Sequence, residues 1–197
     1  MSEKLLQKFA RVISTIFIPP ILTLISFIYL ALTFENYNNI KIYLIVIATI
    51  LGFILQIASF IYFYRKGLVS DVDAKNKKER TIPYLVSIII YIAGFILLLI
   101  CQVSNISIAF WFCYISNTFL VILINRYLKI SIHAMGVSGP LALFTFILGF
   151  QTLLLLPILF AVGWSRIKLN CHSITEVFTG ALLGYISVYI QLSIFLK

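Results

Sequence analysis

The chain has 197 residues, of which 62% are hydrophobic and only 11% charged, and its formal net charge is +9. A soluble globular domain does not carry so much apolar surface, and the apolar runs reach the roughly 20 residues that a helix needs to cross a bilayer. These values exclude an ordinary soluble protein. They predict an all-α, polytopic transmembrane helical bundle of six to seven spans that forms a single membrane domain over residues 1–197.

The first two apolar segments are predicted to be two amino-terminal spans within residues 12–64. The first span covers residues 12–34, is expected to be retained rather than cleaved, and contains Pro19 and Pro20, which predict a kink. The second span covers residues 42–64. Residues 65–80, which follow, hold six of the fifteen basic residues and three of the six acidic ones. This first polar junction, taken as 65–81, is therefore an obvious place to look for function.

Two further spans, residues 82–102 and 106–125, are predicted to form a helical hairpin. The second polar junction, residues 126–139, then brings basic, hydroxyl and imidazole groups together. The basic residues lie mostly in short loops, where a cluster of positive charge attracts anions. We therefore expect membrane lipids and phosphorylated substrates as partners, and no nucleic acid.

The segment from residue 133 to residue 164 is nearly all apolar, and it fits either one overlong helix or two short helices broken near residues 149–151. Periodicity alone does not decide between them. The third polar junction, residues 165–176, precedes the last span, residues 173–195.

Arg166, His172 and Glu176 of the third junction have the spacing R-x5-H-x3-E. If the last helix begins near His172, the imidazole and the carboxylate share one face. A carboxylate beside one ring nitrogen fixes the tautomer and leaves the other nitrogen free to attack, and an arginine offers a planar fork for phosphate oxygens. An interfacial arginine and a helix-capping histidine are the alternative. Because a carboxylate within an apolar helix is costly, a functional site is favoured. Gly180 and Gly184 are expected to allow close helix packing.

With these residues the sequence resembles the type 2 phosphatidic acid phosphatase superfamily, whose signatures are K-x6-R-P, P-S-G-H and S-R-x5-H-x3-D. The segment from Ser165 to Glu176 matches the third signature, with glutamate in place of aspartate. Residues 130–133 (Ile-Ser-Ile-His) resemble the second, with isoleucine at the proline and glycine positions. In the first signature Asp73 holds the lysine position, the next proline after Arg80 is three residues on, and Lys77 is the nearest substitute for the lysine.

The resemblance covers roughly residues 65–190 and implies a phosphatase core that needs no metal and no cofactor. In such a site His172 attacks phosphorus and forms a phosphohistidine, Glu176 orients it, and His133 protonates the leaving oxygen. The equatorial oxygens and the phosphate would be held by Arg80, Arg166, Lys77 and Ser131. The implied function is hydrolysis of a lipid phosphate or a polyprenyl diphosphate.

The three junctions can converge only if an even number of spans separates each from the next. This favours the broken version of the ambiguous segment, with helices over residues 134–150 and 152–166, and seven spans. The amino terminus, the three junctions and thirteen of the fifteen lysines and arginines then share one face. The positive-inside rule makes that face cytoplasmic, whereas members of the resembled family commonly act on the outer side. We expect a multi-pass protein of the cell membrane with a cytoplasmic-facing site.

Two rival functions remain open. Asp71 and Asp73 would hold Mg²⁺ in a prenyl- or phospho-alcohol transferase, although a solvated acidic loop explains the same pair. The departures from the first two signatures favour a non-catalytic relative that binds lipid phosphate or serves as a membrane scaffold.

Overall fold

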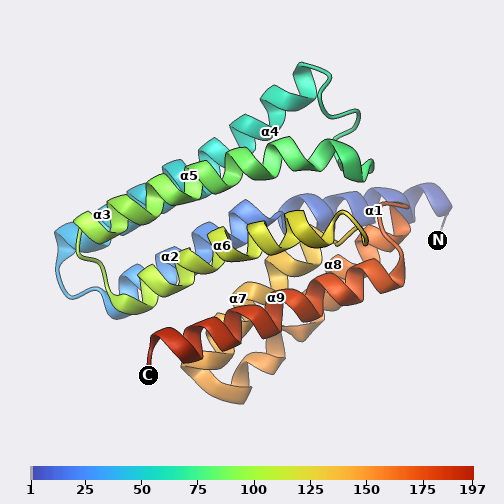
Figure 1. Cartoon of the computed structure of the whole chain (residues 1–197). Helices are drawn as coiled ribbons and strands as arrows, with labels where there is room; N and C mark the ends of the chain where they lie inside the picture. Colours follow the sequence, from blue (N-terminus) through green and yellow to red (C-terminus); the bar gives the residue numbers. More distant parts are fainter. Residues whose placement is uncertain (1) are drawn as a thin grey trace.

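In the computed structural model, which describes residues 2–197, every regular element is a helix (Figure 1). Five helical stretches are long and apolar enough to cross a membrane, or six if the bent pair α1–α2 is one span. The all-helical prediction is confirmed, and the prediction of seven spans stays a prediction. The elements are α1 (Glu3–Ile16), α2 (Pro19–Phe34), α3 (Asn38–Ile47), the π-helix η1 (Ala48–Ile54), α4 (Leu55–Arg65), the 3₁₀ helix η2 (Lys77–Arg80), α5 (Thr81–Ile100), α6 (Asn105–Ile124), α7 (Ile132–Leu148), the 3₁₀ helix η3 (Gly149–Leu155), α8 (Leu156–Lys168) and α9 (Ile174–Phe195).

A break between α1 and α2 replaces the continuous first span expected over residues 12–34. The two helices are bent by 41°. Ile18 is extended because it precedes Pro19, and Pro19 and Pro20 begin α2, where the first N–H groups have no helical acceptor to lose. The predicted kink is thus confirmed as a full break, and α1 leaves the direction of α2.

The second span is one helical stretch of 28 residues, from Asn38 to Arg65, with the π-helix η1 in its middle. The predicted hairpin is present as α5 and α6, joined by a turn in which Gln102 has a φ of 52°. The stretch α3–η1–α4 packs along α5, the helices α7, α8 and α9 pack together, and α2 and α6 contact both groups.

The long apolar segment is broken where the two-helix alternative placed the break. Gly149 ends α7 with a φ of 71°, a left-handed conformation that glycine adopts without steric cost. The 3₁₀ helix η3 turns the chain, and α8 packs back against α7. The two helices have 17 and 13 residues, and this reversal returns the end of α8 to the end of the bundle where α7 began.

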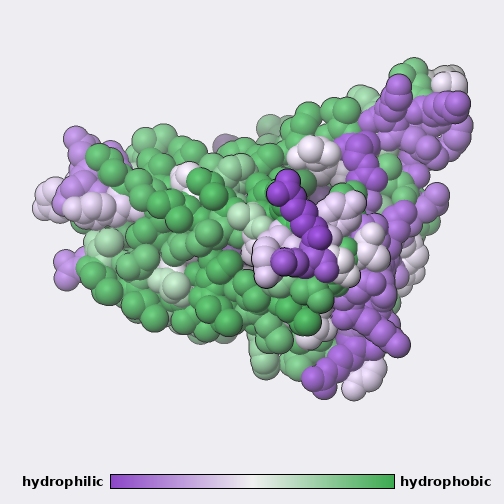
Figure 2. Space-filling model, turned by 90° about the horizontal axis from the view of Figure 1, so that it is seen from above, coloured by the Kyte–Doolittle hydropathy of each residue, from purple (hydrophilic) through white to green (hydrophobic). Residues whose placement is uncertain are grey.

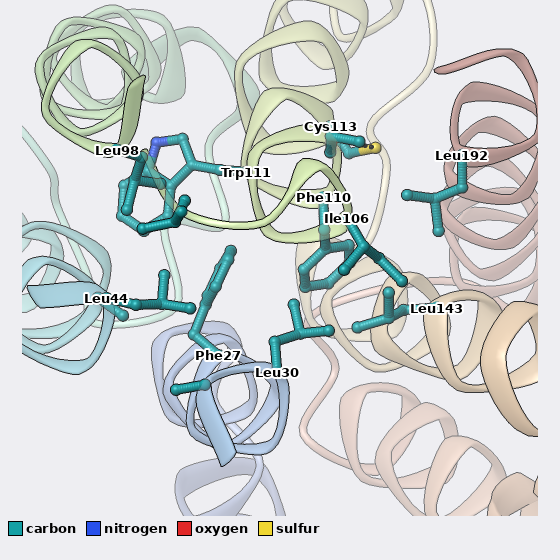
Figure 3. Close-up of a cluster of buried hydrophobic side chains, with 14 of the residues drawn as sticks. Phe27, Leu30, Leu44, Leu98, Ile106, Phe110, Trp111, Cys113, Leu143 and Leu192 are labelled. Atoms are coloured by element: carbon teal, nitrogen blue, oxygen red, sulfur yellow. Dashed lines mark hydrogen bonds between the residues drawn. The ribbon is translucent and has the colours of Figure 1, made fainter. Parts of the chain in front are cut away.

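Trp111 of α6 lies at the centre of the core, fully buried. Its indole N–H donates to the carbonyl of Tyr91 (2.8 Å), and the absence of a side chain at Gly94 leaves room for the ring. Phe27, Phe110 and neighbouring leucines fill the space around it (Figure 3). The indole therefore joins α5 and α6 at mid-bundle.

Polar side chains gather at the ends of the bundle (Figure 2). The larger hydrophilic area lies at the end that carries the amino terminus, and the smaller one lies at the opposite end. The surface between them is mostly apolar, with one hydrophilic patch on the face seen in Figure 2. Many large apolar side chains are exposed along this belt, among them Ile89, Ile100 and Phe160. The surface is compatible with a multi-pass membrane protein.

Candidate active site

The three polar junctions meet at the larger hydrophilic end. Lys129 Nζ of the second junction donates to the carbonyl of Cys171 in the third (2.6 Å), and the N–H of Ser131 donates to the carbonyl of Glu176 (3.2 Å). Arg80 of the first junction donates from Nη1 to the carbonyl of Ile130 (3.0 Å). The predicted convergence of the junctions is confirmed.

The close packing of α7 against α9 brings the second and third junctions together. A Cβ on Gly180 would lie 2.6 Å from the carbonyl oxygen of Ser131, and one on Gly184 would lie 2.8 Å from the carbonyl oxygen of Met135. Backbone atoms cannot yield as a flexible side chain does. The expectation that these two glycines allow close helix packing is confirmed.

The five-residue gap between Arg166 and His172 is set by the end of α8. The carbonyl of Arg166 accepts the N–H groups of Cys171 (3.0 Å) and His172 (3.3 Å), and Asn170 adopts a left-handed φ of 52°. Asparagine is one of the few residues that accept this conformation readily, and such a residue commonly ends a helix. The turn folds His172 back beside the last turn of α8.

Glu176 makes two contacts with one oxygen. The helix α9 begins at Ile174, with Ser173 as its N-cap, and Glu176 Oε2 accepts the N–H of Ser173 (3.2 Å) in a capping box. The same oxygen lies 2.8 Å from His172 Nδ1. His172 thus precedes the helix instead of sharing its face, and the predicted imidazole–carboxylate pair forms across the N-cap. Glu176 therefore both caps helix α9 and contacts one ring nitrogen of His172.

Arg80 faces the other nitrogen of His172. Its guanidinium is 4% exposed, its Nε donates to the carbonyl of Ala74 (2.7 Å), and its Nη2 lies 3.5 Å from His172 Nε2. Burial, and then the positive charge of Arg80, lower the pKa of His172 to about 2. The imidazole is therefore neutral near pH 7, with Glu176 at Nδ1 and a lone pair on Nε2.

Arg166 is 1% exposed, and its charge is only partly satisfied by the protein. Its Nη1 donates to Ser14 Oγ of α1 (2.7 Å) and to Asp73 Oδ1 (2.9 Å). Its Nε is buried and has no hydrogen-bond partner among the described residues. A buried donor without an acceptor costs on the order of 1–3 kcal/mol, more for a charged group. Arg166 therefore keeps one N–H donor, at Nε, that no acceptor among the described residues uses.

A cavity of about 620 Å³ connects these groups. Its polar end is lined by Arg80, His133, Arg166 and His172, four of the predicted site residues, together with Arg11, Ser14 and Asp73. From there it runs between helices α2, α4, α5, α6 and α7, past mainly apolar side chains with some hydroxyl and amide groups. The arrangement can hold an anion at one end and an apolar chain along its length.

The other three predicted residues do not line this cavity. Glu176 lies behind His172. Ser131 is the buried N-cap of α7, where its hydroxyl accepts the N–H of Ala134 (3.4 Å). Lys77 Nζ donates to the carbonyls of Arg126 (3.1 Å) and Tyr127 (3.4 Å), and so holds the first junction to the second.

Three residues at the polar end of the cavity were not among the predicted site residues. Arg11 and Ser14 belong to α1, far from any signature, and Asp73 is predicted only as the residue at the lysine position of the first signature, as a metal ligand or as part of a solvated loop. Asp73 accepts from Arg11 Nη1 and Nη2 (both 2.9 Å) as well as from Arg166. Burial alone would raise the pKa of Asp73, but the hydrogen bonds from Arg11 and the charge of Arg166 outweigh it and hold that pKa well below its usual range.

The contacts of Asp71 and Asp73 do not favour the magnesium hypothesis. The Asp71 carboxylate accepts the N–H groups of Asp73 (2.8 Å) and Lys75 (3.0 Å), and Asp73 is paired with two arginines. Within residues 2–197, no three histidine, cysteine or acidic side chains are grouped as metal ligands. Both carboxylates are already bound by protein donors.

No family model, no curated protein and no solved structure matches this chain.

Proposed function

We propose that this chain is a membrane-embedded phosphatase that hydrolyses a lipid phosphate or a polyprenyl diphosphate through a phosphohistidine at His172. The single observation that carries the proposal is that a neutral, carboxylate-oriented imidazole and a fully buried arginine, Arg166, line the same cavity. A phosphate oxygen is the acceptor that a guanidinium binds most strongly, through charge-assisted hydrogen bonds.

In the first step, the Nε2 lone pair of His172 attacks phosphorus, and the bond from phosphorus to the leaving oxygen breaks. His133, as the imidazolium, gives a proton to that oxygen and becomes neutral, while Glu176 stabilises the positive imidazole of His172 through Nδ1–H. Arg80 and Arg166 bind the equatorial oxygens, where charge develops. In the second step, water attacks phosphorus, the P–N bond electrons return to Nε2, and His133 takes the proton of the water.

The shape of the cavity supports a lipid rather than a soluble phosphate ester. Only its polar end carries charged side chains, and the remainder is lined mainly by groups such as Phe60, Phe110 and Val121. Small-molecule sites commonly combine a long apolar wall with a few polar groups that fix orientation. An acyl or isoprenoid chain fits along this wall while its phosphate lies on the arginines.

The test is release of inorganic phosphate by the purified full chain from phosphatidic acid, phosphatidylglycerol phosphate and undecaprenyl diphosphate. Wild type is expected to release phosphate from at least one of them, with and without EDTA, and His172→Ala is expected to release none. Lys78→Ala is the matched control, because Lys78 is an exposed residue of the same junction that does not line the cavity, and it should retain activity. Absence of release from all three lipids would overturn the enzymatic proposal.

The departures from the first two signatures favour a second candidate, a non-catalytic protein that binds lipid phosphate. It predicts that the wild-type chain binds these lipids without releasing phosphate and that His172→Ala binds them equally well.

A further inference from the structure

Two neighbouring residues of the first junction, Asp73 and Ala74, accept hydrogen bonds from the two buried arginines of the site. The Asp73 carboxylate accepts from Arg166 Nη1 (2.9 Å), and the Ala74 carbonyl accepts from Arg80 Nε (2.7 Å). These are the two guanidinium groups that would hold the substrate phosphate. One short piece of chain therefore places two oxygen acceptors where an anion would lie.

Asp73 is held in a manner that resembles a bound phosphate. Its two oxygens receive three hydrogen bonds of 2.9 Å from two guanidinium groups, and its side chain is 6% exposed. Carboxylate and phosphate present the same pair of oxygens to a guanidinium fork. Asp73 and Arg166 also both line the cavity that contains His133 and His172. The unpartnered Nε of Arg166 shows that the carboxylate satisfies this arginine only in part.

The segment that carries Asp73 is held by hydrogen bonds within its own turn and by the arginines that contact Asp73 and Ala74. The Asp71 side chain accepts the N–H groups of Asp73 and Lys75, and Ala74 has a left-handed φ of 45°. Left-handed backbone is unfavourable for alanine, so this conformation depends on its contacts being kept. Arg11 is the partner of Asp73 that is open to solvent, with its side chain 45% exposed. The carboxylate can thus leave Arg166 and keep a charge partner at the surface.

We propose that Asp73 is an internal competitor of the substrate phosphate, which must displace the carboxylate from Arg166 to bind. The competition lowers the affinity of the site for anions, and Asp73 thereby sets the affinity and the selectivity of the site. A doubly charged phosphate group exchanges with the single charge of Asp73 more readily than a singly charged phosphodiester headgroup does. This inference depends on the proposed function, because it takes the polar end of the cavity as the phosphate site.

The test measures binding of inorganic phosphate to the purified full chain by titration calorimetry, for wild type, Asp73→Asn and Asp71→Asn. Asp73→Asn should bind phosphate about tenfold more tightly than wild type, because the amide keeps the shape of the side chain but not its charge. Asp71→Asn removes the same charge from the same segment without touching an arginine, and its affinity should stay within about twofold of wild type. Equal or weaker binding by Asp73→Asn, or equal gains in both variants, would overturn the proposal, as would the absence of binding in all three proteins.

Hydrogen exchange of the wild-type chain keeps the proposal testable should Asp73→Asn fail to fold. Saturating phosphate should speed exchange at the amides of Asp73 and Lys75, because displacement of the carboxylate opens the turn that Asp71 holds. Unchanged or slower exchange at these amides, or no binding of phosphate to wild type, would contradict displacement.

The lipid assay separates failure of this inference from failure of the proposed function. Tight phosphate binding by Asp73→Asn with no release from any lipid contradicts the phosphatase alone. Release from a lipid by wild type with no gain of phosphate affinity in Asp73→Asn contradicts the competitor alone.

Discussion

Replacing Glu176 with glutamine removes the negative charge of the side chain but keeps an oxygen that can accept both of its hydrogen bonds. Glu176 Oε2 accepts from His172 Nδ1 (2.8 Å) and from the N–H of Ser173 (3.2 Å). A glutamine oxygen accepts from both groups but carries no charge. A hydrogen bond that involves a charged group contributes about 1.5–3 kcal/mol and a neutral one about 1 kcal/mol.

The charged and the neutral hydrogen bond thus differ by roughly 1–2 kcal/mol, and this difference matters mainly while His172 is positively charged. In the proposed reaction, His172 becomes positively charged as the phosphohistidine forms. Since 1.36 kcal/mol is a factor of ten in rate, kcat for phosphate release should fall about 5- to 30-fold. The cap keeps its acceptor, so the free energy of unfolding should change by less than about 1 kcal/mol. Initial rates at saturating lipid and a thermal melt in detergent measure the two quantities.

Glu79→Gln is the matched control. Glu79 lies in the first junction, accepts the N–H of Ser70 (2.7 Å), and has no part in lining the cavity. Its replacement should leave kcat unchanged. An unchanged kcat in Glu176→Gln, or the same loss in both variants, would refute the orienting role of Glu176.

Three further predictions concern pH and stability. The pKa of His172 is lower in the folded chain than the usual value of about 6.5. Below about pH 6.5 the unfolded state therefore binds more protons than the folded state, and the free energy of unfolding should fall as the pH falls. His172→Gln should remove this pH dependence in thermal melts from pH 7.5 to 4. The pKa of Asp73 is likewise lowered, so its stabilising contribution is present above about pH 4 and is lost as the pH falls below it. Asp73→Asn should therefore lower the melting temperature above pH 4 and flatten its pH dependence between pH 4 and 3. Gly94→Ala would place a Cβ against the Trp111 ring and should lower the free energy of unfolding by about 1–3 kcal/mol. In Gly139→Ala the Cβ would lie 3.6 Å from Val188 Cγ2, so the same melt should show a neutral or stabilising effect. Equal effects of the two variants would contradict the close packing of Trp111 on Gly94.

Apolar length and helix-breaking residues predict much of the fold. The boundaries expected for the third, fourth and last spans differ from those of α5, α6 and α9 by at most two residues at either end. The break at Gly149 was among the alternatives because a glycine interrupts an otherwise uniform apolar run. The π-helix η1 was not predicted, since a stretch such as ATILGFI has no feature that distinguishes an extra residue per turn from ordinary α-helix.

The candidate site was predicted unevenly, for physical reasons. Arg166, His172 and Glu176 are close in sequence, so local backbone geometry alone brings them together. Arg11 and Ser14 reach the cavity only through the packing of α1 against α8, a contact between residues about 150 positions apart that no local spacing reveals. The role of Asp73 was missed because a lone acidic residue in a basic loop gives no sign of which cation it will meet.

The bend between α1 and α2 would couple the proposed phosphate site to the thickness of a surrounding bilayer. The helix α2 runs through the apolar belt, and α1, which leaves it at 41°, contributes Arg11 and Ser14 to the anion site. A bilayer that is too thin or too thick is accommodated in part by helix tilt. A tilt of α2 that residues 17 and 18 passed on to α1 would change the distance between the guanidinium groups of Arg11 and Arg166. Under the proposed function, lipid composition would then act mechanically on the charges that surround the phosphate.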